Sequence, residues 1–140
     1  MNYLKSIVFA LSLGIFSVSA IAKTSSSEVK NINVQFKQNA YSATYKGKIS
    51  GYGYDQYHLK AKKGQLLKIT ATSASKNMGV YLFNKELPDS VDLSTGSLSL
   101  DTNGNYVLPH SGAYQIRILQ PRAFARRGEK FSYVIQVSIH

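Results

Sequence analysis

Cysteine is absent from this chain. No disulfide can therefore form, and packing and backbone hydrogen bonds must supply the whole stability of the fold. Acidic residues are also scarce, because only seven Asp and Glu stand against 17 Lys and Arg, which gives a formal net charge of +10. Such an imbalance favours anionic partners and hastens encounter with them, although it says nothing about the fold.

Apolar runs long enough to span a membrane are missing, and the one apolar stretch that stands out lies at the N-terminus. Lys5 precedes a short apolar segment, Ile7 to Phe16, and Ala20-Ile21-Ala22 supplies the small residues of a cleavage site. Residues 1–22 are therefore predicted to be a cleaved secretory signal, and the product to be exported without membrane insertion. The 118 residues that remain of 140 carry a net charge of +9 once Lys5 is lost, and they suffice for a single domain with its own core.

Helical periodicity is also missing from the chain after the predicted signal. Residues 23–30 are polar and without period, and we expect them to form a flexible lead-in to one domain spanning residues 31–140. In that domain the apolar residues alternate in short segments that are separated by turn signals, which is typical of β-sandwiches and small barrels. We therefore predict an all-β fold, a compact antiparallel β-sandwich of about eight strands.

Alternating apolar side chains mark the individual strands. The last segment is the clearest, because every second residue from Phe131 to Ile139 is apolar and should lie in the core. Asn103-Gly104 is the strongest hairpin signal, since both positions tolerate the positive φ of a type I′ turn, and it should join Leu98–Leu100 to Tyr106–Leu108. The other expected strands contain Ile32, Val34 and Phe36 on one face, then Tyr57–Ala61, Leu67–Ala71, Val80–Phe83 and Tyr114–Ile118.

Candidate catalytic and metal-binding groups are few. Asp89 and Asp92 would serve as an acid/base pair only if they converged in a pocket, and carboxylates in such loops more often bond to local backbone N–H groups. Asp101 to Asn105 looks like a calcium loop, but its glycine comes early and Gly112 stands where the bidentate Glu belongs. We therefore expect no enzymatic activity, no metal and no cofactor, and the predicted export argues against a nucleic-acid partner.

A tyrosine placed between two glycines is the first candidate for a binding surface. In Gly51-Tyr52-Gly53-Tyr54-Asp55 the ring of Tyr52 has no bulky neighbour to pack on, so it can serve as a rigid anchor for a partner. The alternative is that Tyr52 and Tyr54 simply cap the edge of a sheet, since tyrosine is common in both roles.

A basic loop is the second candidate. The segment from Gln120 to Gly128 carries three arginines and no acidic residue. Pro121 and Gly128 suit the start and the end of a short helical turn, which would set Arg122 and Arg126 side by side. Two like charges so placed repel each other, which favours a carboxylate-bearing partner across them. The alternative is an ordinary solvated basic loop.

An ordered set of residues along the chain carries a family resemblance. The set consists of Gly51-Tyr52, Tyr54-Asp55, Ala61 to Gln65, Asp89 to Ser94, Asp101, Gly104, Tyr106, Leu108-Pro109, Ser111-Gly112, Tyr114, Arg117, Leu119-Gln120, Arg122 and Ala125-Arg126. It covers nearly all of the chain after the predicted signal, in order and with few gaps, which makes it more specific than any single short motif. With these residues the chain resembles the PliG family, the periplasmic inhibitors of g-type (goose-type) lysozyme.

The resemblance implies a compact β-sandwich in the periplasm whose partner is g-type lysozyme. The sequence does not give the oligomeric state, and we expect a monomer. It implies that this protein plugs the active-site cleft of the enzyme with Tyr52, Arg122 and Arg126, and so protects peptidoglycan. Secondary contacts are expected among Tyr54, Ser90, Asp92, Ser94 and Arg127. The chain departs from the other members at Pro121 and Phe124, where they carry Thr and a polar residue.

A second interpretation is a periplasmic glycan-binding β-sandwich module. It would use the same tyrosines and arginines on anionic envelope polymers such as peptidoglycan or lipopolysaccharide, and the basic net charge suits it. The two interpretations differ in what they bind without lysozyme present: only the module should sediment strongly with purified sacculi.

Overall fold

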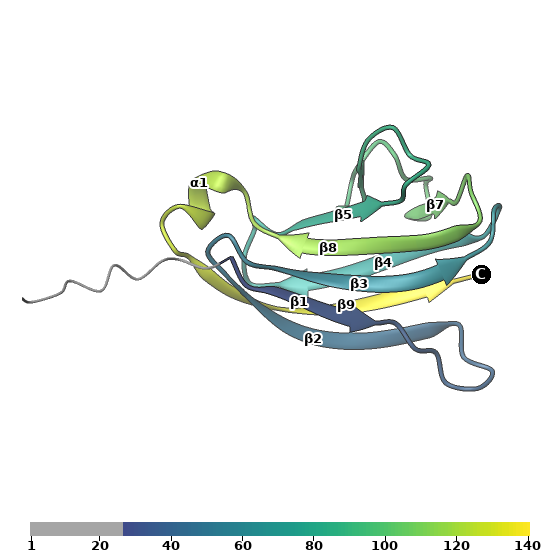
Figure 1. Cartoon of the computed structure of the whole chain (residues 1–140), viewed down its shortest axis with the longest axis horizontal. Coiled ribbons are helices and arrows are strands. Elements are labelled where there is room, and N and C mark those ends of the chain that lie inside the picture. The colour runs from purple at the N-terminus through teal and green to yellow at the C-terminus, as the bar shows by residue number, and fades with distance from the viewer. Residues whose placement is uncertain (1–26) are drawn as a thin grey trace, which may run out of the picture.

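Two packed β-sheets form the domain in the computed structural model, which describes residues 27–140 (Figure 1). The predicted signal and the first part of the predicted lead-in lie outside those residues. The five-stranded sheet has the order β1 (Val29–Asn33), β3 (Tyr54–Ala61), β8 (Gly112–Leu119), β5 (Gly79–Phe83) and β6 (Val91–Asp92). The four-stranded sheet has the order β2 (Ser42–Ser50), β9 (Lys130–Ile139), β4 (Leu66–Ser73) and β7 (Asn105–Val107). The prediction of an all-β sandwich is confirmed.

The core lies between the sheets and is built from alternating residues of their long strands. In β9 the five apolar side chains at every second position from Phe131 to Ile139 are all buried, as the alternation predicted. Tyr114, Ile116 and Ile118 of β8 face them from the other sheet and are fully buried. Apolar burial at roughly 25 cal/mol per Å² is the main stabilising contribution, as it must be in a fold without disulfides.

Strand β2 is a long element that the apolar pattern did not reveal. It pairs with β9 along its whole length, but two of its inward positions are occupied by the small residues Ala43 and Gly47. Gly47 lies opposite Tyr133, and a Cβ atom there would collide with the Tyr133 hydroxyl group and would lie 2.5 Å from Oδ2 of Asp55. The strand therefore carries glycine where the large side chains of its neighbours need the space.

Tyr133, Asp55 and Tyr57 form a buried hydrogen-bonded cluster that links the two sheets. The hydroxyl of Tyr133 in β9 donates to the carboxylate of Asp55 in β3, and the hydroxyl of Tyr57 in β3 donates to Tyr133. Burial, followed by the bond to Asp55, holds the pKa of Tyr133 far above its ordinary value, and burial also raises the pKa of Tyr57. Both hydroxyls thus stay protonated, and the buried carboxylate keeps its donor.

Substitution of Gly47 by Ala should destabilise the domain by about 1–3 kcal/mol, because the added methyl group overpacks this cluster. Urea unfolding followed by circular dichroism measures the change. Thr44→Ala is the control, since Thr44 lies in the same strand with its side chain exposed. Equal midpoints for the parent and Gly47→Ala would show that the cluster can move aside at no cost.

Strand β1 differs from the expected antiparallel arrangement. It pairs in parallel with β3, from Val29 opposite Tyr54 to Asn33 opposite His58. A parallel pair is possible because the intervening strand β2 crosses to the other sheet. Strand β1 begins at Val29, so the last two residues of the expected lead-in belong to the sheet. It ends at Asn33, before the Val34 and Phe36 that were expected to continue it.

The expected hairpin at Asn103-Gly104 is wrong. Leu98 to Leu100 form turns rather than a strand, and the Leu98 side chain is fully exposed. Gly104 has a φ of +80°, but Asn103 does not have the positive φ that a type I′ turn requires. The carboxylate of Asp101 accepts hydrogen bonds from the backbone N–H groups of Asn103 and Asn105, which lowers its pKa and imposes a different turn.

Candidate functional site

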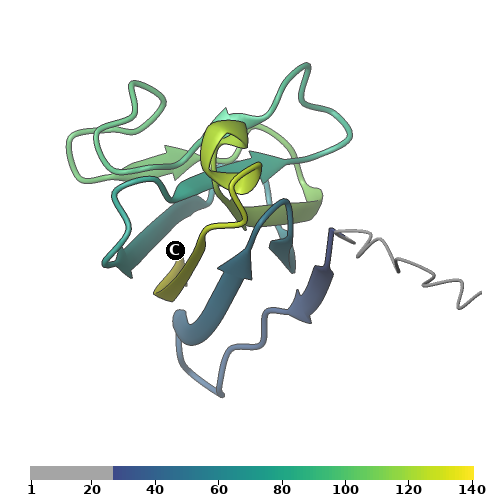
Figure 2. The same ribbon diagram turned by 90° about the vertical axis from the view of Figure 1, so that its left-hand side faces the viewer.

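The two segments singled out as binding surface meet at one end of the sandwich. The turn between β2 and β3 carries Tyr52, and the loop between β8 and β9 contains the short helix α1 (Arg122–Ala125). Figure 1 shows α1 and this turn at the same end of the sheets, and Figure 2, which looks onto that end, shows them as neighbours. The structure thus brings together residues that are about 70 positions apart in the sequence.

One buried side chain, that of Gln120, joins the two segments. Its amide nitrogen donates to the backbone carbonyl of Gly51 at 2.9 Å and to that of Glu129 at 2.7 Å. The backbone N–H of Gly51 also donates to the carbonyl of Glu129, at 3.0 Å. The residue before Tyr52 is therefore tied to both ends of the basic loop. This role of Gln120 was missed from the sequence, because nothing local distinguishes a bridging glutamine from an exposed one.

The basic loop has a fixed helical shape. The N–H of Arg126 donates to the carbonyl of Arg122 at 2.9 Å, which sets the two arginines one turn apart on the same side, as predicted. Gly128 closes the turn in the left-handed region with a φ of +68°. The N–H groups of Gly128 and Glu129 bond to the carbonyls of Ala125 and Phe124, the paired bonds of a Schellman motif. Ala125 is buried, which anchors the turn to the domain.

The arginines of the loop differ in their surroundings. Arg122 and Arg126 are exposed, and within residues 27–140 neither takes part in an ion pair or a side-chain hydrogen bond. Arg127 is paired internally: its Nη2 lies 3.0 Å from Oε1 of Glu129, and its guanidinium stacks 4.9 Å from the ring of Phe124. The carboxylate of Glu129, which follows the loop in the sequence, is thus used by Arg127, and the positive charges of Arg122 and Arg126 face solvent.

Tyr52 projects from a tightly packed turn. Its side chain is 43% exposed, whereas the flanking Gly51 and Gly53 are buried. Gly51 has a φ of +55°, and a Cβ atom on Gly53 would lie 2.9 Å from the carbonyl oxygen of Glu28 and 3.0 Å from that of Ser50. Glycine is therefore required on both sides of the tyrosine, on one side for backbone conformation and on the other for space.

Two of the expected secondary contacts, Tyr54 and Arg127, lie at this end, and the other three belong to the segment around β6. Tyr54 belongs to β3, which is flanked by β1 and β8, so it does not cap a sheet edge. The carboxylate of Asp92 accepts the N–H of Ser94, and the hydroxyl of Ser94 accepts the N–H of Val80. These two side chains shape their own segment around β6, while Ser90 is exposed.

Comparison with known proteins shows the family of the chain. No family model matches the chain. The chain is 41% identical over 122 residues to the inhibitor of g-type lysozyme of Escherichia coli K12, and the match covers 87% of this chain and 90% of that protein. The chain belongs to the PliG family. The resemblance predicted from its residues is confirmed, and the family is one of inhibitors, not enzymes.

Solved PliG structures share the fold. PliG from Salmonella Typhimurium, a periplasmic inhibitor of g-type lysozyme, is 41% identical with a TM-score of 0.75, and the match covers 79% of this chain and 98% of that one. PliG from Aeromonas hydrophila, with the same described activity, is 33% identical with a TM-score of 0.64, over 81% and 98% of the two chains. Within residues 27–140 of this PliG chain, no helix has the length and apolar character needed to cross a membrane.

Proposed function

We propose that this protein inhibits g-type lysozyme by placing Tyr52, Arg122 and Arg126 in the active-site cleft of the enzyme. The observation that carries the proposal is the junction at Gln120, which holds the tyrosine turn against the basic loop while both arginines remain exposed and without an ion pair among the described residues. The inhibitory activity follows from membership of the PliG family.

The chemistry of a lysozyme cleft suits this arrangement. Lysozymes cleave a glycosidic bond with the help of carboxyl groups in a cleft shaped for a sugar chain. A guanidinium meets a carboxylate through two parallel N–H···O bonds in one plane, so one arginine can bind a catalytic acid and exclude the substrate at once. Tyr52 would pack at the lip of the cleft, where a sugar ring would otherwise lie.

The rigidity of the two segments favours tight binding. The Schellman closure, the buried Ala125 and the Gln120 bridge fix the backbone that carries all three side chains. Association then costs less conformational entropy than it would for mobile loops. Arg127 has a supporting role in this proposal, because its ion pair with Glu129 braces the loop instead of reaching outward.

We place the protein in the periplasm, where it would protect peptidoglycan. The related structures are described as periplasmic inhibitors, and residues 1–22 have the pattern of a cleavable secretory signal. A cell envelope is also the compartment in which an exported inhibitor meets lysozyme before the enzyme reaches its substrate.

Titration of g-type lysozyme with the purified protein tests the proposal. We expect activity to fall to zero as the inhibitor approaches equimolar amounts with the enzyme, and the end point to follow the enzyme concentration. A protein that acts by covering the glycan would instead show an end point that follows the amount of peptidoglycan. Full activity at a large excess of inhibitor would contradict the proposal outright.

A further inference from the structure

The outer face of the five-stranded sheet holds a guanidinium between two aromatic rings. The Arg117 side chain of β8 lies with its Cζ atom 4.2 Å from the ring centroid of Phe83 in β5 and 4.9 Å from that of Tyr54 in β3. Its Nε donates to the side-chain oxygen of Gln56 at 2.6 Å. Three neighbouring strands thus fix the position and the plane of this cation.

The terminal N–H groups of the Arg117 guanidinium have no hydrogen-bond partner among the described residues. Within residues 27–140, Arg117 makes no ion pair, and the bond to Gln56 occupies only one of its five donors. Asp92 of the edge strand β6 is separated from Arg117 by Tyr81 of β5, and its carboxylate accepts the backbone N–H of Ser94. A half-buried arginine with an open, planar set of N–H groups is suited to a carboxylate.

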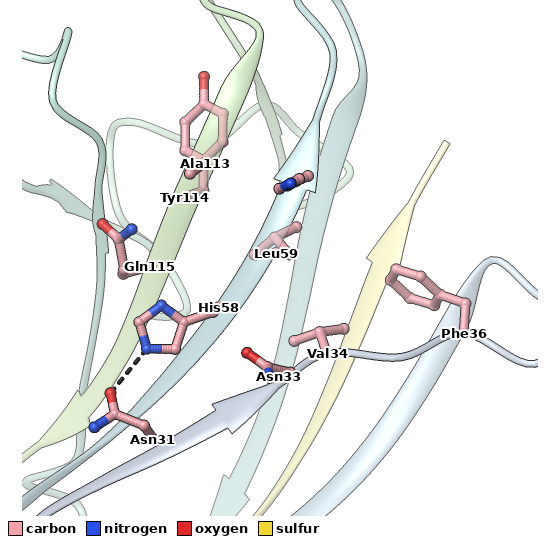
Figure 3. A pocket seen from close by; sticks show the side chains of 10 residues that line it. Asn31, Asn33, Val34, Phe36, His58, Leu59, Ala113, Tyr114 and Gln115 are labelled. Atoms are coloured by element: carbon pink, nitrogen blue, oxygen red, sulfur yellow. Dashed lines mark hydrogen bonds between the residues drawn. The ribbon is translucent and has the colours of Figure 1, made fainter.

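A chain of polar side chains leads from this cation along the same face. Gln56 donates to the side chain of Asn31, and Asn31 in turn bonds to Nε2 of His58 at 2.8 Å. Figure 3 shows Asn31 and His58 at the margin of a groove of about 640 Å³, with Gln115 beside them. That volume lies in the range of about 300–1,000 Å³ that is usual for small-ligand sites. Polar and apolar side chains both line the groove, among them Asn33, Lys60, Val34 and Phe36.

We propose that this outer face, from Arg117 to the groove beside His58, binds a glycan that carries carboxylate groups on its sugar rings. Flat aromatic rings suit the apolar faces of pyranoses, and the amides of Asn31, Gln56 and Gln115 can exchange hydrogen bonds with hydroxyl and acetamido groups. The charge is complementary to a carboxylate, because Arg117 at one end of this face and the exposed Lys60 in the groove are both positively charged.

This site adjoins the surface proposed to bind lysozyme, since Tyr54 comes two residues after Tyr52 and Arg117 three residues before Gln120, but it includes none of the three side chains placed in the cleft. The tyrosine turn and α1 lie at one end of the sandwich, whereas Arg117, Gln56 and His58 project from the face of one sheet. The proposal therefore does not depend on the inhibitory mechanism. It would allow the inhibitor to hold an acidic glycan while its inhibitory end stays free.

Two soluble tetrasaccharides test the proposal without lysozyme present. One alternates N-acetylglucosamine with N-acetylmuramic acid, and the other consists of N-acetylglucosamine alone and so lacks the lactyl carboxylates. Isothermal titration calorimetry should show that the acidic tetrasaccharide binds at least about tenfold more tightly, since only it can pair with Arg117. Amide shift changes in NMR spectra should fall on β3, β5 and β8 and not on α1.

Arg117→Gln should lower the affinity for the acidic tetrasaccharide by about tenfold or more while lysozyme inhibition stays at the parental level. Arg126→Gln is the matched control: it should weaken lysozyme inhibition and leave the affinity for the acidic tetrasaccharide unchanged. Arg117→Lys keeps the positive charge but loses the planar guanidinium group. Its affinity for the acidic tetrasaccharide should lie between those of the parent and of Arg117→Gln. Equal affinity for the two tetrasaccharides, shift changes confined to α1, or unchanged binding in Arg117→Gln would overturn the proposal.

Discussion

Arg122→Ala and Arg126→Ala should each weaken inhibition of g-type lysozyme by roughly 30-fold to several thousand-fold, which corresponds to about 2–5 kcal/mol of binding free energy. This is the usual cost of removing one partner of a charge pair that is buried in a complex, because the carboxylate on the other side is left without its donor. Inhibition constants from activity measured against inhibitor concentration give the change directly.

The same two variants should unfold like the parent. Both side chains are exposed, and within the described residues neither makes an ion pair or a side-chain hydrogen bond, so each truncation should change the free energy of unfolding by less than about 0.5 kcal/mol. Lys46→Ala is a suitable control, because it removes one positive charge from an exposed position in β2. Equal losses of affinity in all three variants would show that only net charge matters and would remove the two arginines from the binding site.

Local sequence signals predicted the elements that depend on neighbouring residues. The alternation from Phe131 to Ile139 identified β9, because a strand with one buried face must place apolar side chains at every second position. Pro121 and Gly128 identified the turn of α1, because each residue has a backbone preference that suits one end of a helix. The fold class follows from many such signals together.

Features that depend on distant partners were not predictable in the same way. Gly47 weakens the strand pattern of β2, and its reason lies in Tyr133 and Asp55, which belong to two other strands. The turn near Asn103 depends on the competing side chain of Asp101. Of the candidate site, the sequence indicated the exposed tyrosine and arginines, but their meeting at one end depends on the long-range bonds of Gln120.

Gln120→Leu should impair stability and inhibition together. The substitution keeps the side chain large but removes the amide, so the carbonyl of Gly51 loses its donor in a buried place. An unsatisfied buried group of this kind costs about 1–3 kcal/mol, and the midpoint of thermal unfolding should fall accordingly. The turn of Tyr52 would also be released from the basic loop, and ordering it again on binding should weaken inhibition by roughly 5-fold to 150-fold.

The combination of the two effects is what separates a positioning residue from a contact residue. Arg122 and Arg126 should affect affinity alone, whereas Gln120 should affect affinity and unfolding, and the affinity should be measured well below the unfolding midpoint of the variant. Gln136→Leu makes the same chemical change at an exposed position of β9 and should affect neither quantity. If Gln120→Leu unfolds earlier yet inhibits as strongly as the parent, the bridge serves only the fold, and the pose of Tyr52 and the arginines must be held by the remaining contacts of α1.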